Sequence, residues 1–361
     1  MNKKIDEISE RIDSNPLGAL MHGQRELFHS NLLAWFFKTL PDSADYVFKK
    51  LTINLANKNA RTIHREKNNM DLVMYWTDKA PLIIENKVFS IPNFKQLEKY
   101  SEKAKKWEFN QTKKVLLSPI SMDNLPEGWK QKNYSWLSGE IKKSLSTTKA
   151  NNTEMKYAKE TMEHYWKLCR DIQQIVEITK VLGEDETVWL TNEQLPSDEH
   201  SQLRNTLNKA RAAHVAEYLR KQNNLSTERL NSTLSRTKPL VDLLELIELE
   251  DQGKMRPIYA GWQLEGDQFR RHVEIDKGES NQDLFGPKNK AQREKLMCEK
   301  EDILFKYPKH LAKKESRQRN KFGNYGESGF YKYKNVPDLT VEQLITAAEE
   351  VHNIVKPYLK K

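Results

Sequence analysis

Two acidic residues and one lysine stand where a folded pair of strands would bring them together. Asp71 opens one apolar run, and Glu85, Asn86 and Lys87 close the next. Carboxylates held close together repel each other unless a cation lies between them. Mg²⁺ prefers oxygen ligands, keeps several waters and shares its shell with phosphates. We therefore expect Asp71, Glu85 and the Asn86 carbonyl to hold Mg²⁺, with Mn²⁺ as a substitute, while Lys87 orients or deprotonates the water that attacks a phosphodiester.

The two apolar runs predict an antiparallel hairpin around the short polar turn 77–80. If the turn is centred on its two middle residues, paired positions have numbers that sum to about 157. Asp71 then lies opposite one of the residues 85–87, roughly 5 Å away between Cβ atoms. Glu85 and Lys87 are two apart on one strand and point to the same face. The pattern by itself is common, and a surface hairpin with a Lys–Glu pair is the alternative interpretation.

Polar residues on two flanking helices extend this pattern. A helix predicted after the hairpin carries Gln96 and Tyr100 one turn apart on one face. An upstream helix, predicted over residues 24–39, carries Glu26 and His29 one turn apart, ahead of an apolar stretch. The chain thus presents a first helix with an acid, then strands, then a hairpin with two acids and a lysine, then a second helix.

In this order the residues resemble the PD-(D/E)XK nuclease superfamily, in particular its RecB-like branch with a Gln-x-x-x-Tyr motif. The resemblance covers the N-terminal part of the chain, residues 1–140. It implies that Asp71 and Glu85 bind the metal and that Lys87 is the catalytic lysine. Met70 departs from the pattern, because the name of the superfamily places a proline there.

The resemblance also implies roles for the flanking residues. Glu26 would add a metal contact, and Gln96 and Tyr100 would position the substrate backbone. His29 would ligate the metal or contact substrate, although a histidine on a helix is also often a packed residue. Glu66, at the end of the predicted preceding strand, is a second candidate for the additional acid. A role in restriction or antiviral (phage) defence follows from the resemblance alone.

Composition narrows the class of protein. The length of 361 residues suits more than one domain, and the formal net charge of +9 favours an anionic partner. The two cysteines are far apart, which argues against a disulfide framework, a zinc ribbon or an iron–sulfur cluster. The sequence has neither a secretory signal nor an apolar stretch of the about 20 residues that span a bilayer. We expect a cytoplasmic protein that acts on nucleic acid, DNA rather than RNA, with a homodimer or a partner protein left open.

Three regions are expected along the chain. Residues 1–150 predict a PD-(D/E)XK nuclease-like core of the α/β class, with a restriction-endonuclease-like mixed sheet flanked by helices. Residues 151–250 predict a helical region, and residues 251–361 an α+β region that binds substrate or a partner. Apolar spacing predicts three helices in the middle region, over residues 154–179, 198–221 and 240–249.

The last region contains a basic run, residues 288–321. Basic side chains neutralise phosphates, and aromatic side chains stack on unpaired bases. Nucleic-acid contact and a solvated helix face are both consistent with the run. The aromatic residues that flank it are Phe305, Tyr307, Phe322, Tyr325, Phe330, Tyr331 and Tyr333. The sequence is therefore consistent with two alternative functions. One is a metal-dependent nuclease, and the other is a nucleic-acid-binding or scaffolding protein that keeps the nuclease fold without catalysis.

Overall fold

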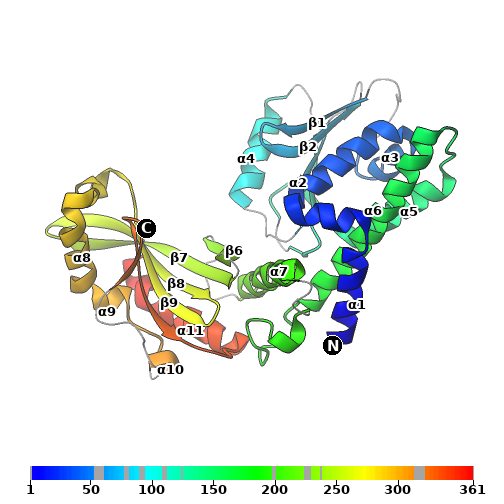
Figure 1. Ribbon diagram of the computed structural model, residues 1–361. Helices are drawn as coiled ribbons and strands as arrows, with labels where there is room; N and C mark the ends of the chain where they lie inside the picture. The colour runs from blue at the N-terminus through cyan, green and yellow to red at the C-terminus, as the bar shows by residue number, and fades with distance from the viewer. Residues whose placement is uncertain are drawn as a thin grey trace. The chain divides into compact units, whose positions relative to one another are not determined.

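The chain folds into two compact units (Figure 1). The first comprises Met1–Thr179 and Asn192–Ala210, and the second Lys180–Thr191 and Arg211–Lys361. The computed structural model describes residues 2–52, 61–76, 81–88, 94–107, 112–122, 125–196, 201–222, 229–235, 238–312 and 322–360.

A five-stranded mixed sheet forms the centre of the first unit, with strand order β1-β2-β3-β4-β5. The first three strands pair antiparallel, whereas β3–β4 and β4–β5 are parallel. Helix α4 (Phe94–Lys105) connects β3 to its parallel neighbour β4. The strands are β1 (Arg61–Lys67), β2 (Met70–Trp76), β3 (Leu82–Asn86), β4 (Lys113–Leu117) and β5 (Trp129–Lys132).

Helices cover both faces of this sheet. Figure 1 shows α4 on one side and α2 on the other. Helix α4 lies against β5, where Trp129 Nε1 donates a hydrogen bond to the Leu97 carbonyl (3.2 Å). On the other side, Phe37 of α2 makes an edge-to-face contact with Trp76 of β2. The helices are α1 (Asn2–Asp13), α2 (Pro16–Thr39), α3 (Pro41–Phe48), α4 (Phe94–Lys105), α5 (Tyr134–Thr147) and α6 (Thr153–Ile178).

Local sequence explains where the longer helices begin. Asn15 caps α2 by accepting a hydrogen bond from the Leu17 amide, and Pro16 suits the first turn because that position needs no amide donor. Asn133 caps α5 in the same way. Helix α7 (Ser201–Arg220) follows the 3₁₀ turn η1 (Asn192–Gln194).

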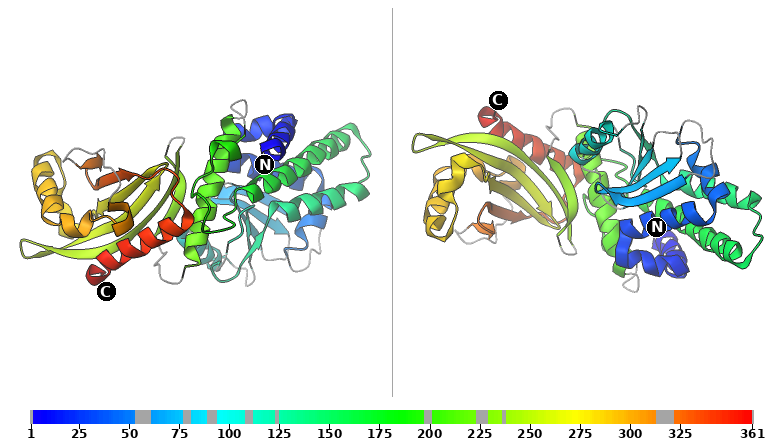
Figure 2. Two further views of the ribbon diagram at one scale, coloured as in Figure 1. Left: turned by 90° about the horizontal axis from the view of Figure 1, so that it is seen from below. Right: turned by 90° about the horizontal axis from the view of Figure 1, so that it is seen from above.

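A six-stranded antiparallel sheet, in the order β10-β11-β9-β8-β7-β6, organises the second unit. Helix α11 starts at a capping box formed by Thr340 and Gln343 and lies along this sheet (Figure 2). The strands are β6 (Leu230–Ser235), β7 (Lys238–Asp251), β8 (Lys254–Glu265), β9 (Gln268–Ile275), β10 (Gly323–Tyr325) and β11 (Gly329–Asn335). The helices are η3 (Glu279–Leu284), η4 (Pro287–Asn289), α8 (Lys290–Glu299), α9 (Glu301–Leu304), α10 (Lys309–Ala312), α11 (Val341–Val355) and η5 (Lys356–Tyr358).

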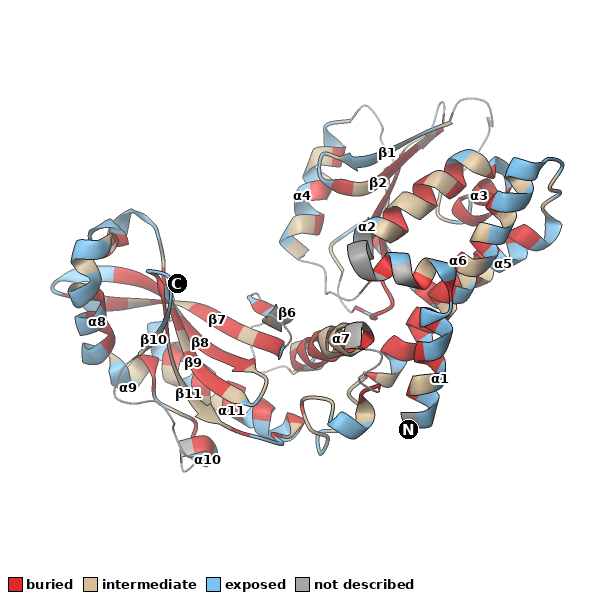
Figure 3. Ribbon diagram, viewed as in Figure 1, coloured by how far each residue is buried: buried red, intermediate tan, exposed pale blue. Residues whose placement is uncertain are grey.

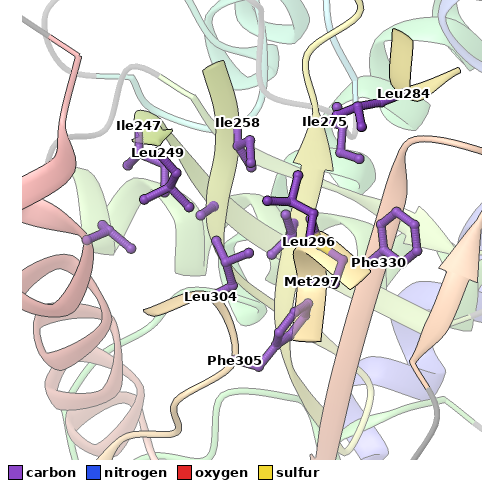
Figure 4. Close-up of a cluster of buried hydrophobic side chains, with 13 residues drawn as sticks. Ile247, Leu249, Ile258, Ile275, Leu284, Leu296, Met297, Leu304, Phe305 and Phe330 are labelled. Carbon is purple, nitrogen blue, oxygen red and sulfur yellow. The ribbon is translucent and has the colours of Figure 1, made fainter. Parts of the chain in front are cut away.

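The core of the second unit lies between one face of its sheet and the helices α8, α9 and α11 (Figure 4). Ile247, Ile258 and Val273 contribute from three neighbouring strands, and each is fully buried. Phe305 and Phe330 belong to this core, and Phe322 packs against it. Of the two interpretations left open for this region, base stacking does not fit Phe305 and Phe330, because both rings are buried in this core.

The helix expected at 240–249 in the helical region 151–250 is also wrong, since this segment belongs to β7. Leucine-rich runs satisfy helical and strand periodicity at once. The two-residue turn Gln252–Gly253, with both φ angles positive, closes a hairpin in which Asp251 pairs with Lys254. Such turns favour hairpins because their twist matches that of the strands. The helices expected over residues 154–179 and 198–221 are confirmed by α6 and α7.

Burial follows the layers of each unit, and β2 is largely buried (Figure 3). In the described part of the chain, no helix combines the length and apolarity needed to cross a bilayer.

Candidate active site

The hairpin β2–β3 brings Asp71 to the end of β3. Leu72 pairs with Ile84 and Val73 with Ile83, so paired residues have numbers that sum to 156. The register agrees with the sequence-based estimate and leaves Asp71 facing the last residues of β3. The Asn86 amide donates a hydrogen bond to Asp71 Oδ2 at 2.7 Å. This bond joins the start of one strand to the end of the other.

Glu85 is the most deeply buried acid of the site, with 1% of its surface exposed. Lys87 Nζ lies 2.9 Å from Glu85 Oε1, and Gln96 Nε2 lies 3.4 Å from the same oxygen. Oε2 of Glu85 has no hydrogen-bond partner among the described residues. Burial raises the pKa of Glu85 to about 7, and the nearby Asp71 carboxylate adds to this shift while Lys87 opposes it.

These features fit a divalent cation. A buried carboxylate oxygen without a donor is costly when ionised, and a metal ion would compensate it. Within the described residues, no three side chains from His, Cys, Asp and Glu gather closely enough to hold a metal. The protein ligands would therefore be the Asp71 and Glu85 carboxylates and the backbone carbonyl of Asn86, with water completing the shell.

The side chains of Gln96 and Tyr100, both on α4, form hydrogen bonds beside the acids of the site. Gln96 Nε2 donates to Tyr100 Oη at 2.5 Å, and Tyr100 Oη donates to the Asn69 carbonyl at 2.5 Å. Burial raises the pKa of Tyr100, so its hydroxyl stays protonated. The pair links Glu85 to the turn that precedes Asp71.

His29 lies apart from the acids. Its side chain is fully buried, Nδ1 lies 3.1 Å from Tyr165 Oη, and burial lowers its pKa to about 3. Its ring contacts that of Tyr134 edge-on, with centroids 5.3 Å apart. Since Tyr134 contacts Asn86, whose side chain points away from that of Glu85, His29 lies behind the opposite face of the sheet. A neutral, buried ring does not support direct contact with substrate.

Glu66 and Glu26 are the two candidates for an additional acid, and the structure describes the side chain of Glu66 alone. Glu66 is exposed near the end of β1, with a positive φ of 54°. Glu26 lies within α2, but its side chain is outside the described part of the structure.

Tyr134 is a residue of the site that sequence reasoning missed. Its hydroxyl donates a hydrogen bond to Asn86 Oδ1 at 2.7 Å, and both residues are fully buried. The contact depends on how α5 packs on β3, so residue spacing contains no signal for it. Asn86 is thereby fixed by Asp71 at its backbone and by Tyr134 at its side chain.

Comparison with known proteins identifies the family of this region. The model of the PD-(D/E)XK nuclease superfamily matches residues 15–177, which contain the whole site. Searches of curated proteins and of solved structures found no significant match. The superfamily suggests a metal-dependent nuclease, while the RecB-like branch and the Gln-x-x-x-Tyr motif stay predictions. The family model matches this region, and its mixed sheet carries the two acids and the lysine. Residues 15–177 therefore belong to the PD-(D/E)XK nuclease superfamily.

Proposed function

We propose that the protein is a Mg²⁺-dependent nuclease that hydrolyses phosphodiester bonds in DNA. One observation carries the proposal: Glu85, almost fully buried, has one oxygen held by Lys87 at 2.9 Å and the other without a partner among the described residues. A structural ion pair would gain by pairing both oxygens, because an unsatisfied buried acceptor costs stability.

Each residue has a distinct role in this proposal. Asp71, Glu85 and the Asn86 carbonyl hold the cation, and Glu26 is a further candidate. A bound Mg²⁺ would polarise the scissile phosphate and lower the pKa of a coordinated water. Lys87, which keeps 15% of its side chain exposed, orients the attacking water or takes up its proton.

Gln96 and Tyr100 act at the start of the substrate path in this proposal. Their hydrogen bonds to Glu85 and to the Asn69 carbonyl keep the acids in register. A substrate phosphate would meet them on the same side as Glu85. For His29 we propose support of the Tyr134–Asn86 contact in place of substrate binding, because its ring is buried against Tyr134.

Cleavage assays on purified protein test the proposal. Plasmid, linear duplex DNA, single-stranded DNA and RNA are incubated with Mg²⁺, Mn²⁺ or EDTA. We expect cleavage of DNA with either metal, none in EDTA, and loss of at least about 100-fold in Asp71→Ala and Lys87→Ala. Lys130→Ala, an exposed lysine on β5, is the matched control and should cleave like the wild type. Metal-independent cleavage, or full activity in Asp71→Ala, would refute the assignment.

The competing function is nucleic-acid binding without hydrolysis. Binding of the same DNA without cleavage at any metal concentration would favour it. The biological setting that we propose, restriction or phage defence, rests on the resemblance alone. A plaque assay with cells that express the wild type or Asp71→Ala tests it, since protection should depend on Asp71.

A further inference from the structure

Aromatic and basic side chains form a patch next to the candidate active site. The patch comprises His64, Lys67, Tyr75, Lys103 and Trp107, and we call it the α4-edge patch. The ring centroids of His64 and Tyr75 lie 5.5 Å apart, and those of Tyr75 and Trp107 lie 6.2 Å apart. Lys67 Nζ lies 4.7 Å from the Tyr75 centroid and 5.8 Å from that of Trp107. Three rings and an ammonium group thus share one small area.

Tyr75 and His64 of this patch lie on the same face of the sheet as the acids, and the Lys67 ammonium group reaches Tyr75 Oη at 2.9 Å. Tyr75 and Asp71 are four residues apart on β2, and residues separated by an even number point to the same face of a strand. The distance along the strand between their Cα atoms is about 13 Å. His64 pairs with Val73, which also lies on that face.

Helix α4 connects the patch to the site. Gln96, Tyr100 and Lys103 follow one another at spacings of four and three residues, so they lie along one stripe of the helix. Tyr100 and Lys103 donate hydrogen bonds to the carbonyls of Asn69 and Asn68, at 2.5 Å and 2.8 Å. Trp107 follows just beyond the C-terminal end of the helix.

The side chains of the α4-edge patch are more exposed than the aromatic side chains in the core of this unit. His64 is exposed, and Lys67, Tyr75 and Trp107 are half-buried, whereas Phe36 and Phe37 are buried in the core. The exposed Lys99 and Lys106 add positive charge around α4. Aromatic faces beside ammonium groups bind a chain that combines phosphates with unstacked bases. A duplex hides its base faces, so it would use only the lysines.

We propose that the α4-edge patch binds single-stranded DNA and leads it to Asp71 and Glu85. This inference rests on the proposed function and narrows its substrate to DNA with an unpaired segment. The bases stack on Trp107 and Tyr75, and the backbone lies against Lys67 and Lys103.

Binding is measured by fluorescence anisotropy with an oligonucleotide in single-stranded form and as a duplex of the same sequence. All binding variants carry Asp71→Ala, so that the DNA stays intact. Trp107→Ala should weaken single-strand binding about ten-fold, as expected for loss of one stacked base, and change duplex binding less than about two-fold. The matched control is Trp136→Ala, a half-buried tryptophan on α5 whose ring lies 5.3 Å from Lys132 Nζ. It should change neither.

The lysines provide a second measurement. Lys67→Ala should reduce the dependence of binding on salt by about one counterion for each form of DNA. If the Trp107→Ala variant unfolds, His64→Ala, a substitution at an exposed position, is measured in its place. It should also weaken single-strand binding more than duplex binding, by a smaller factor than Trp107→Ala.

The outcomes separate this inference from the proposed function. Equal weakening of single-strand and duplex binding by Trp107→Ala, or no weakening at all, overturns the inference. Cleavage that depends on Asp71 would still leave the nuclease assignment intact in that case. Selective loss of single-strand binding without any cleavage by the wild type would support the patch and refute the nuclease.

Discussion

Replacing Glu85 by Gln should stabilise the metal-free protein at alkaline pH. The wild-type side chain is buried, lies beside Asp71, and has a pKa raised from 4.5 to about 7. Its carboxylate form is therefore disfavoured in the folded state. Glutamine has nearly the same shape, cannot ionise, and keeps an oxygen that accepts a hydrogen bond from Lys87.

The size of the effect follows from the difference in pKa. Below pH 4.5 Glu85 holds its proton in both states, so this group does not destabilise the folded protein. Between pH 4.5 and 7 the unfolded chain loses the proton first, and the free energy of unfolding falls as the pH rises. Above pH 7 the loss is complete and amounts to about 3 kcal/mol.

The assay is urea unfolding in EDTA from pH 5 to pH 8.5, with pulsed hydrogen exchange of peptides from β2 and β3 as the probe. This probe reports the unit that contains the site, whereas a global signal would mix both units. The advantage of Glu85→Gln over the wild type should grow with pH. Glu98→Gln, an exposed position on α4, should follow the wild type at every pH.

Mg²⁺ provides the complementary measurement. Because the cation binds the ionised carboxylate, it should stabilise the wild type more at pH 8 than at pH 5.5, and Glu85→Gln hardly at all. Parallel curves of wild type and Glu85→Gln across the pH range would refute the account of Glu85 as a carboxylate destabilised by burial.

Three further substitutions test other contacts. Tyr134→Phe removes the donor to Asn86 Oδ1 and should cost about 1–3 kcal/mol in urea unfolding. It should also raise the Mg²⁺ concentration for half-maximal cleavage, which Tyr157→Phe, at an exposed tyrosine on α6, should leave unchanged. Tyr100→Phe removes the bonds to Gln96 and Asn69, so kcat should fall about ten-fold while circular dichroism stays native. Ile247→Ala opens a cavity in the core of the second unit and should cost about 2–5 kcal/mol, measured by urea unfolding of that unit.

The hairpin could be predicted because its signals are local. Two apolar runs around a short polar turn set the register to within one residue, and the register alone brings Asp71 to Glu85 and Asn86. The parallel pairing of β3 with β4 is the arrangement that a strand, a helix and a strand in succession favour. Short-range periodicity was sufficient for both.

The features that the sequence did not predict depend on packing between distant segments or on an ambiguous period. Tyr134 is 48 residues from Asn86 in the chain, and no spacing rule joins them. His29 lies one turn from Glu26, but burial against Tyr134 and Tyr165 decides its environment. In β7 the leucines fit either period, and the turn at Gly253 was the overlooked signal for a strand.

The residues at 85, 86 and 87 alternate between two sides of the central sheet. The side chains on the two sides are therefore constrained by different neighbours. Glu85 and Lys87 are fixed by charge, so related chains should vary little there. Asn86 points into the helical layer, where it contacts Tyr134. In an alignment of related chains, substitutions at position 86 should therefore be coupled to substitutions at position 134, independently of the substrate that each relative cleaves.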